Sequence, residues 1–465
     1  MNCYYFKRTI AACFLLAASA VCALAQQWLT AGPYLQELTS DGVTVVFEHG
    51  IPSLSWIEVR EAGSTETTNY YQTVDGQIQV QRQILDANSV APVQNFAIRA
   101  EGLKPNTTYQ YRVRGRKINS LNANGATMSM GVADNYSSGW NDFTTIDPNR
   151  SEHHLFITSD MHNRPDTLAA LLRHLDYKTI DHFFYNGDMT NYVQVGANAE
   201  DLYRGYINTS VELFARHKPF EMVRGNHDTR GNISRHFKDY FPRRNGKIYS
   251  ASRWGDLEVI MLDSGEDKVD DHAEYFGLAA FYKYREEQAE WLKQVIKSEE
   301  FRTAKYRIVI CHFPILVGNK RNDEFDGQPH LSSLILPLLK QCDIDLYVSG
   351  HYHPATYQYF GENYNGQGNK FDEYIVGAHT AMRINIEGGN IRFRVVDHQG
   401  NVLLDKGVTD PKADQKTVFI TTKESERTKP LSCLAPMRGM SDIAEKPLCF
   451  SRRRFSGWGG KLKRQ

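Results

Sequence analysis

The chain has 465 residues, of which 41% are hydrophobic and 12% aromatic, so it is long enough to form two or three packed domains. Lys and Arg together number 54, as do Asp and Glu, so no bulk charge draws the protein to nucleic acid or to an anionic membrane. Any charge selectivity must therefore be local.

Residues 1–25 have the pattern of a signal peptide. Two basic residues precede an apolar stretch that ends in Ala23-Leu24-Ala25, a spacing of small residues typical of a cleavage site. We therefore expect a secreted or periplasmic protein that begins near Gln26. A bulky residue precedes Cys22, which argues against lipid attachment, and no later segment is apolar enough to span a bilayer, so we expect no stable membrane anchor.

Residues 26–147 are predicted to form an all-β domain. The runs DGVTVVFEHG and SWIEVREAG alternate apolar and polar residues, and clusters of Gly, Ser, Asn and Asp separate them. In GLKPNTTYQYRVRG, Tyr109, Tyr111 and Val113 stand at alternating positions. This stretch resembles the tyrosine corner of fibronectin type III domains, which implies a β-sandwich. We expect the domain to act as a spacer or packing partner rather than to bind a ligand.

Residues 148–408 are predicted to form an α/β domain. Apolar runs here alternate with helical stretches such as DTLAALLRHLD and REEQAEWLKQVI. After the loop GENYNGQGNK, the segments EYIVGAHTAMRINIEG and IRFRVVDHQGNVLLD are predicted to be closing antiparallel strands. Periodicity is lost beyond about residue 408, and residues 409–465 are predicted to form a disordered basic tail.

Polar residues that can bind metal follow five of the apolar runs. They are Asp160 and His162 after HLFIT, Asp188 after HFFYN, Asn226, His227 and Asp228 after FEMV, His312 after RIVIC, and His351 and His353 after DLYVS. In α/β sheets, ligands bind at the carboxyl ends of the strands. Buried carboxylates and imidazoles are costly without partners, and each would otherwise need a separate structural explanation. We therefore predict that the set coordinates divalent metal ions.

The types of ligand narrow the choice of metal. Imidazole, carboxylate and an Asn carbonyl without thiolate suit Mn, Fe, Zn or Co better than a sulfur-bound structural zinc site. Cys311 precedes His312 and is expected to face the opposite side of its strand, so we exclude it as a ligand. The sequence does not decide whether Cys311 and Cys342 form a disulfide. So many groups call for two ions, and a pair about 3.5–4 Å apart, bridged by a carboxylate, can hold a phosphate and activate water.

The motifs resemble those of the calcineurin-like metallophosphoesterases. In order, the sequence carries Asp160-Met161-His162, Gly187-Asp188, Gly225-Asn226-His227-Asp228, His312 and Gly350-His351-Tyr352-His353, similar to the DxH, GD, GNHD, H and GHxH motifs of that family. The resemblance covers most of residues 152–355 and implies a two-sheet sandwich with outer helices. Together with the preceding β-sandwich, the layout resembles the purple acid phosphatases within the same superfamily.

The resemblance also implies a role for each matching residue. The first metal would be held by Asp160, His162 and His353. The second would be held by Asn226, His312 and His351, and Asp188 would bridge the two. Gly350 would let the backbone turn tightly, so that two imidazoles of one loop reach both ions.

Two departures separate the sequence from the purple acid phosphatases. Those proteins have a tyrosine ligand three residues after the bridging Asp, where this chain has Asn191, and they lack the counterpart of His162. An iron(III) tyrosinate centre is therefore not expected, and Tyr192 lies one position too late to be taken as a replacement. Asn191 is instead predicted to orient His227 through its amide oxygen, where phosphoprotein phosphatases use an Asp.

We therefore predict a phosphoric ester hydrolase that acts on phosphomonoesters, like an acid phosphatase, by means of a metal-bound hydroxide. The catalytic candidates are His227, Asp228 and Asn191, with His227 stabilising the phosphoryl group or protonating the leaving oxygen. The alternative is a phosphodiesterase or phospholipid-head-group hydrolase on the same centre, and a remote one is an extracellular binding protein with a degenerate site. A small-molecule phosphate ester is the expected partner, nucleic acid is not, and the oligomeric state is left open.

Two further features border the motifs. Arg164 and Arg230 are near enough in sequence to contact a substrate phosphate, although a surface position is favoured for each. The segment from Thr229 to Phe281 is predicted to shape the mouth of the pocket. Its acidic cluster is predicted to be a solvated loop, with attraction of cationic head groups as the alternative.

Overall fold

The computed structural model describes residues 28–409, apart from residues 52, 75–76, 79–94, 122–127, 196–201, 319 and 354–356. The predicted signal peptide lies outside these residues, and so does the predicted tail beyond Thr409. Of the helices that are described, none has both the length and the apolar character needed to cross a lipid bilayer.

The amino-terminal part folds into antiparallel sheets, as the alternating pattern predicts. One sheet has the strand order β1-β2-β7, and another has the order β10-β8-β3-β4 with β9 paired to β8. Every second residue of β3 is buried, and two of these residues, Ile57 and Val59, join a shared hydrophobic core. The backbone N–H of Lys104 donates to the Tyr109 hydroxyl at 2.9 Å, which is the contact of a tyrosine corner. The strands are β1 (Leu29–Gln36), β2 (Gly42–His49), β3 (Ser53–Glu61), β4 (Thr68–Tyr71), β7 (Asn95–Glu101), β8 (Thr108–Leu121), β9 (Met128–Ser137) and β10 (Asn141–Thr144), and a separate pair is formed by β5 (Thr73–Val74) and β6 (Gln77–Ile78).

From His153 onward the chain forms two six-stranded mixed sheets. The first has the order β13-β12-β11-β20-β21-β22 and the second β14-β15-β16-β17-β19-β18. Strands β11, β12 and β13 are parallel, as are β15, β16, β17 and β19, so within each sheet their carboxyl ends lie at one edge. The strands are β11 (His153–Thr158), β12 (His182–Asn186), β13 (Phe220–Val223), β14 (Ser250–Trp254), β15 (Leu257–Leu262), β16 (Tyr306–Cys311), β17 (Leu346–Ser349), β18 (Gln358–Phe360), β19 (Asp372–Ile375), β20 (Thr380–Glu387), β21 (Asn390–Asp397) and β22 (Val402–Thr409).

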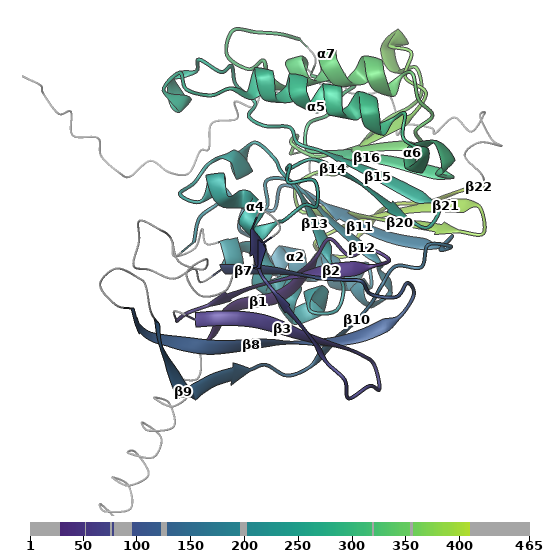
Figure 1. Cartoon of the computed structure of the whole chain (residues 1–465). Helices are drawn as coiled ribbons and strands as arrows, with labels where there is room; N and C mark the ends of the chain where they lie inside the picture. The colour runs from purple at the N-terminus through teal and green to yellow at the C-terminus, as the bar shows by residue number, and fades with distance from the viewer. Residues whose placement is uncertain are drawn as a thin grey trace, which may run out of the picture. The chain divides into compact units, whose positions relative to one another are not determined.

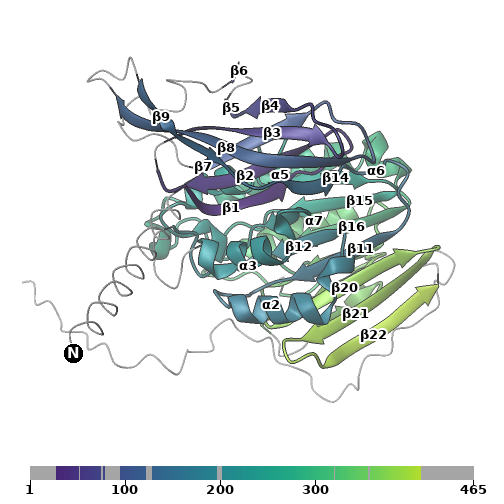
Figure 2. The same cartoon turned by 90° about the horizontal axis from the view of Figure 1, so that it is seen from below.

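The two sheets pack face to face, and helices cover their outer faces (Figures 1 and 2). Alternate residues of β11 point to opposite sides: Leu155 and Ile157 join the core between the sheets, whereas Phe156 packs beneath α2. The amphipathic α5 and α7 cover the second sheet. The helices are α2 (Pro165–His174), α3 (Asn208–Ser210) between the π-helical turns η3 (Tyr203–Ile207) and η4 (Val211–Ala215), α4 (Phe237–Tyr240), α5 (Phe281–Val295), α6 (Glu299–Thr303) and α7 (Gly327–Leu339), and the 3-10 turns are η2 (Tyr177–Thr179), η5 (His227–Thr229), η6 (Ser234–His236), η7 (Ala273–Tyr275) and η8 (Tyr364–Gly366).

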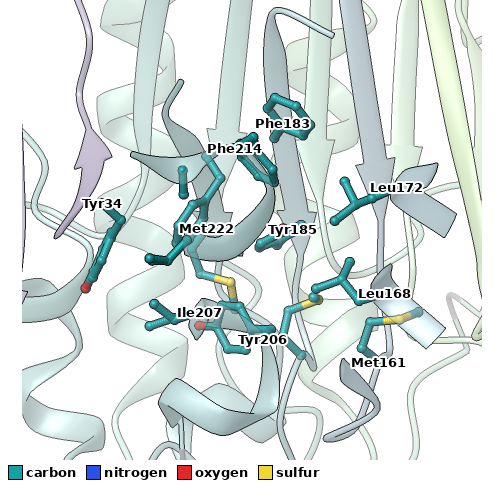
Figure 3. Close-up of a cluster of buried hydrophobic side chains, with 14 of the residues drawn as sticks. Tyr34, Met161, Leu168, Leu172, Phe183, Tyr185, Tyr206, Ile207, Phe214 and Met222 are labelled. Atoms are coloured by element: carbon teal, nitrogen blue, oxygen red, sulfur yellow. The ribbon is translucent and has the colours of Figure 1, made fainter. Parts of the chain in front are cut away.

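The amino-terminal sheets share side-chain contacts with the first core sheet. Tyr34 of β1 joins the buried cluster of Figure 3, and its hydroxyl donates to the backbone oxygen of Tyr240 at 2.9 Å. The Gln36 amide donates to the backbone oxygen of Phe220 at 2.7 Å. These contacts give the amino-terminal sheets the role of a packing partner beneath the strands that lead to the site.

One of the predicted closing strands belongs to the other sheet, and the two cysteines of the core are not bonded to each other. Strands β20, β21 and β22 are antiparallel, as expected, but β19 lies in the second sheet, parallel to β17. Its residues Glu373, Tyr374 and Ile375 are all buried, and a continuous buried run is typical of a parallel strand covered on both faces. Cys311 and Cys342 are free thiols, so they form no disulfide.

Candidate metal centre

Six of the predicted ligands gather in two groups at the carboxyl ends of the core strands. The groups are Asp160, His162 and His353, and Asp188, His312 and His351, and within each the potential ligand atoms lie within 4.8 Å of one another. The six residues come from the loops after β11, β12, β16 and β17, which the parallel pairing brings to the same edge. The two histidines of the Gly350-His351-Tyr352-His353 loop therefore fall into different groups.

Glycines in the motifs provide the space that the loops need. A Cβ atom on Gly350 would lie 1.9 Å from Ser159 Oγ, and one on Gly187 would lie 2.4 Å from His312 Nδ1. Any larger residue would push these loops apart. The positive φ of the Gly350 loop belongs to His351, at 69°, so Gly350 serves the close approach of the loops rather than the turn that we predicted for it.

Hydrogen bonds set the tautomers of two ligand histidines. His312 Nδ1 lies 2.8 Å from the backbone oxygen of Asn186, which can only accept, so Nδ1 carries a proton and Nε2, once deprotonated, offers its lone pair to the site. His162 Nδ1 lies 2.9 Å from Asn191 Oδ1 in the same arrangement. The Nε2 atoms of His162 and His353 are then only 3.3 Å apart, a distance that a shared cation would make favourable.

Asn226 provides a direct test of whether the residues fit metal ions. Its side chain is 3% exposed, and Oδ1 has no hydrogen-bond partner among the described residues. A buried carbonyl oxygen without a partner is costly, and coordination of a cation would satisfy it. Imidazole nitrogens, carboxylates and this amide oxygen, without thiolate, form a donor set suited to divalent transition metals. The residues present therefore fit a binuclear metal site.

The carboxylates and imidazoles perturb one another strongly. Burial alone would raise the pKa of Asp188, but His312 and His227 hold it well below its ordinary value. Burial would likewise lower the pKa of His312, but Asp188 and Asp160 raise it to about 10. Burial lowers the pKa of His351 to about 3, which keeps that ring neutral. A metal entering the second group must therefore displace the His312 proton, whereas His351 is already a competent ligand.

The three catalytic candidates occupy different positions. The His227 ring is half-buried, its centroid 5.0 Å from that of His162, and its Nδ1 donates to the backbone oxygen of Asn191 at 3.2 Å. The Asn191 amide oxygen contacts His162 rather than His227, so Asn191 reaches His227 through its backbone and not as we predicted. Asp228 is fully buried, and its Oδ2 accepts from the backbone N–H groups of Asp188 and Gly225 at 2.9 and 2.8 Å. Burial and the charge of Asp188 raise the pKa of Asp228 to about 8.

The first part of the acidic segment is buried rather than solvated, as at Glu266, whereas Asp271 is exposed. Glu266 is 1% exposed and binds Arg230 through two hydrogen bonds of 2.7 and 2.9 Å. It also accepts from the Thr229 hydroxyl at 2.6 Å. Arg230 is thus committed to Glu266, whereas Arg164 is exposed, and Tyr192 is 46% exposed.

Sequence reasoning missed Asn186, which joins the two core sheets directly beneath the ligands. Its side-chain amide donates to the backbone oxygens of Cys311 at 3.1 Å and Val348 at 3.4 Å, at the ends of β16 and β17. Its own backbone oxygen accepts from His312. The signal for this role was an Asn as the last residue of the otherwise apolar run HFFYN, because a buried amide needs partners.

Comparison with known proteins agrees with this architecture. Residues 153–355 match the family model of the calcineurin-like phosphoesterases. The purple acid phosphatase PPD1 from yellow lupin (Lupinus luteus) seeds is 15% identical, and the match covers 82% of this chain and 74% of that chain with a TM-score of 0.55. The phosphoesterase Yfce from E. coli is 10% identical over 55% of this chain and 98% of its own, with a TM-score of 0.27. No curated protein matches the sequence. Residues 153–355 are therefore similar to the calcineurin-like phosphoesterases, and the fold, with antiparallel sheets before the two-sheet core, is similar to that of a purple acid phosphatase.

Proposed function

We propose that the chain hydrolyses phosphate monoesters, in the manner of an acid phosphatase, at a centre for two divalent transition-metal ions. The observation that carries the proposal is the pair of Asp-His groups at one sheet edge, with the His227 ring beside them. The shared fold with a purple acid phosphatase supports the preference for monoesters over diesters.

Each ion would be held by its own set of residues, with one carboxylate common to both. One ion would be held by Asp160, His162 and His353, the other by Asn226, His312 and His351, and Asp188 would be shared by both. When bound, the ions would supply Lewis acidity at phosphorus and a water of lowered pKa. The His353 side chain is 51% exposed whereas Asp160 and His312 are fully buried, so the substrate would approach from the side of His353.

His227 is the residue that we assign to the leaving oxygen. The Asn191 carbonyl holds its Nδ1 proton, which leaves Nε2 available on the far side of the ring. As an imidazolium, His227 would donate from Nε2 to the leaving oxygen or to a phosphoryl oxygen. Asp228 and Asn191 would act as positioning residues, because Asp228 accepts from two backbone N–H groups and Asn191 contacts the rings of His162 and His227.

The proposal is tested by a hydrolysis screen on metal-depleted protein that is reconstituted with Mn, Fe, Zn or Co in turn. A phosphomonoester, a phosphodiester and pyrophosphate are compared by kcat/KM. We expect the monoester to be hydrolysed at least about tenfold faster than the diester. Faster diester hydrolysis would move the assignment to a phosphodiesterase. Two bound ions without turnover of any of the three would favour a binding protein.

A further inference from the structure

His379 lies beside the first ligand group although no motif includes it. Strand β20 begins at Thr380, and the next residue, Ala381, pairs with Thr158 of β11. The Thr158 hydroxyl also donates to the backbone oxygen of Thr380 at 2.8 Å. Because the two strands are antiparallel, each step back along β20 matches a step forward along β11. Asp160 is two residues beyond Thr158 and His379 is two residues before Ala381, so both lie at the same end of this strand pair.

The backbone of His379 shares an unusual conformation with the site. Its φ is 63°, in the left-handed region that residues with a Cβ atom rarely adopt. The same region is occupied around the ligand groups by Asp160, His162, Asn163, Asp188 and His351. Such conformations cluster where the surrounding structure holds a functional side chain in place. His379 therefore belongs by position and by backbone to the site, yet it is not one of the ligands.

The charged and titratable groups that act on the His379 side chain are one arginine and two histidines. Burial, followed by Arg164, His398 and His353, lowers the pKa of His379. The His398 ring centroid lies 5.5 Å from that of His379, and the His398 N–H donates to the His379 carbonyl at 3.0 Å. The half-buried ring is thus next to His398, and the charges of Arg164 and His353 also act on it.

Arg164 completes this edge of the site. It follows His162 by two residues, its side chain is exposed, and its Nη1 donates to the neutral backbone oxygen of Met161 at 3.2 Å. Arg230, by contrast, is held by the carboxylate of Glu266. Of these two arginines, Arg164 is therefore the one that is exposed and that no carboxylate of the described residues holds.

We propose that Arg164 and His379 form an anion-binding rim that recognises a second anionic group, a phosphate or a carboxylate, on the alcohol part of the substrate. The inference rests on the proposed function, because it assigns the rim to the leaving group while the first phosphate lies at the metal ligands. A guanidinium binds phosphate or carboxylate through two parallel hydrogen bonds, and an imidazole N–H adds a third donor. The preferred substrates are then bisphosphates and phosphorylated acids.

The test compares two esters that differ only in the second anion. Propane-1,3-diol bisphosphate and 3-hydroxypropyl phosphate have the same carbon chain, and kcat/KM is measured for both with the reconstituted wild type and with Arg164→Gln and His379→Asn. Asn is chosen because it tolerates a positive φ. We expect the wild type to prefer the bisphosphate, and each variant to lower that preference by about tenfold, as for the loss of one charge-assisted hydrogen bond. The matched control is Arg173→Gln, an exposed arginine at the other end of α2, which should retain the preference.

The outcomes separate the rim from the hydrolase itself. Hydrolysis of both esters without preference in the wild type would overturn the rim and leave the proposed function standing. An undiminished preference in both Arg164→Gln and His379→Asn would also overturn it, as would an equal loss in Arg173→Gln. A wild type that binds two metals and hydrolyses neither ester would overturn the proposed function, and the rim with it.

Discussion

Glu373 is predicted to control the second metal ion without being one of its ligands. The side chain is fully buried in β19, and its carboxylate accepts from the backbone N–H groups of Ile315 at 3.0 Å and Leu316 at 2.9 Å and from the Ser349 hydroxyl at 2.9 Å. Ile315 and Leu316 follow His312, and Ser349 precedes His351. One carboxylate thus fixes both loops that carry histidines of the second group.

The substitution Glu373→Gln gives a measurable perturbation with little change in volume. The amide nitrogen takes the place of one oxygen, so at least the Leu316 N–H loses its acceptor and faces another donor. A buried donor left unsatisfied costs about 1–3 kcal/mol. If that cost falls on the loops that hold His312 and His351, the affinity of the second ion drops by about 10- to 100-fold, the range found for partners of metal ligands. The first group, which Glu373 does not contact, should keep its affinity.

The assay is a stepwise metal titration of metal-depleted protein by calorimetry. Burial raises the pKa of Glu373 to about 7, so the titration is run at about pH 8.5, where the wild-type carboxylate is ionised. Glu258→Gln is the matched control, because Glu258 is a buried glutamate of β15 in the same sheet, outside the ligand loops. Equal weakening of both ions in Glu373→Gln, or no weakening at all, would refute the reasoning.

Three further predictions concern the acid, the pH dependence of stability and the colour of the centre. His227→Ala should retain both metals and slow the hydrolysis of an alkyl phosphate by about 10²–10⁴-fold. The loss should be smaller on nitrophenyl phosphate, because its leaving group needs no proton. An equal loss on both substrates would show that His227 is not the acid. Burial raises the pKa of Glu258 from 4.5 to about 7, so its contribution to stability is present below pH 4.5 and is lost as the pH rises through 7. Between those values the unfolding free energy of the wild type should fall by up to about 3 kcal/mol relative to Glu258→Gln in urea unfolding, and parallel curves would contradict this. The iron-loaded protein should lack a strong purple charge-transfer band, because Asn191 replaces the tyrosine ligand, and such a band would indicate Tyr192 or another tyrosine as a ligand.

Much of the site was predictable because its residues follow strands. Asp160, Asp188 and His312 each come at or just after the end of an apolar run, and parallel pairing brings such ends to one edge whatever the loops do. The fold class followed from the same alternation of strands and helices. Strand β19 was misassigned because its buried run carries no alternation that indicates direction or sheet.

The supporting contacts could not be predicted in the same way. Glu373 meets Ile315 across 58 positions, and Asn186 meets Cys311 across 125, so no local pattern records either contact. The role of Asn191 depended on whether its amide oxygen would contact His162 or His227, and the sequence is compatible with either contact. Such contacts are fixed by the packing of the two sheets, which only the folded chain defines.

The central claim is that two ions share Asp188, and metal content measures it most directly. Wild type and Asp188→Ala are saturated with one metal, freed of excess by gel filtration, and analysed for metal per chain by mass spectrometry. The wild type should hold two ions, and Asp188→Ala should lose much of the bound metal, because each ion loses a ligand and their mutual repulsion is no longer offset. Two ions retained in Asp188→Ala, or a single ion in the wild type, would contradict the account.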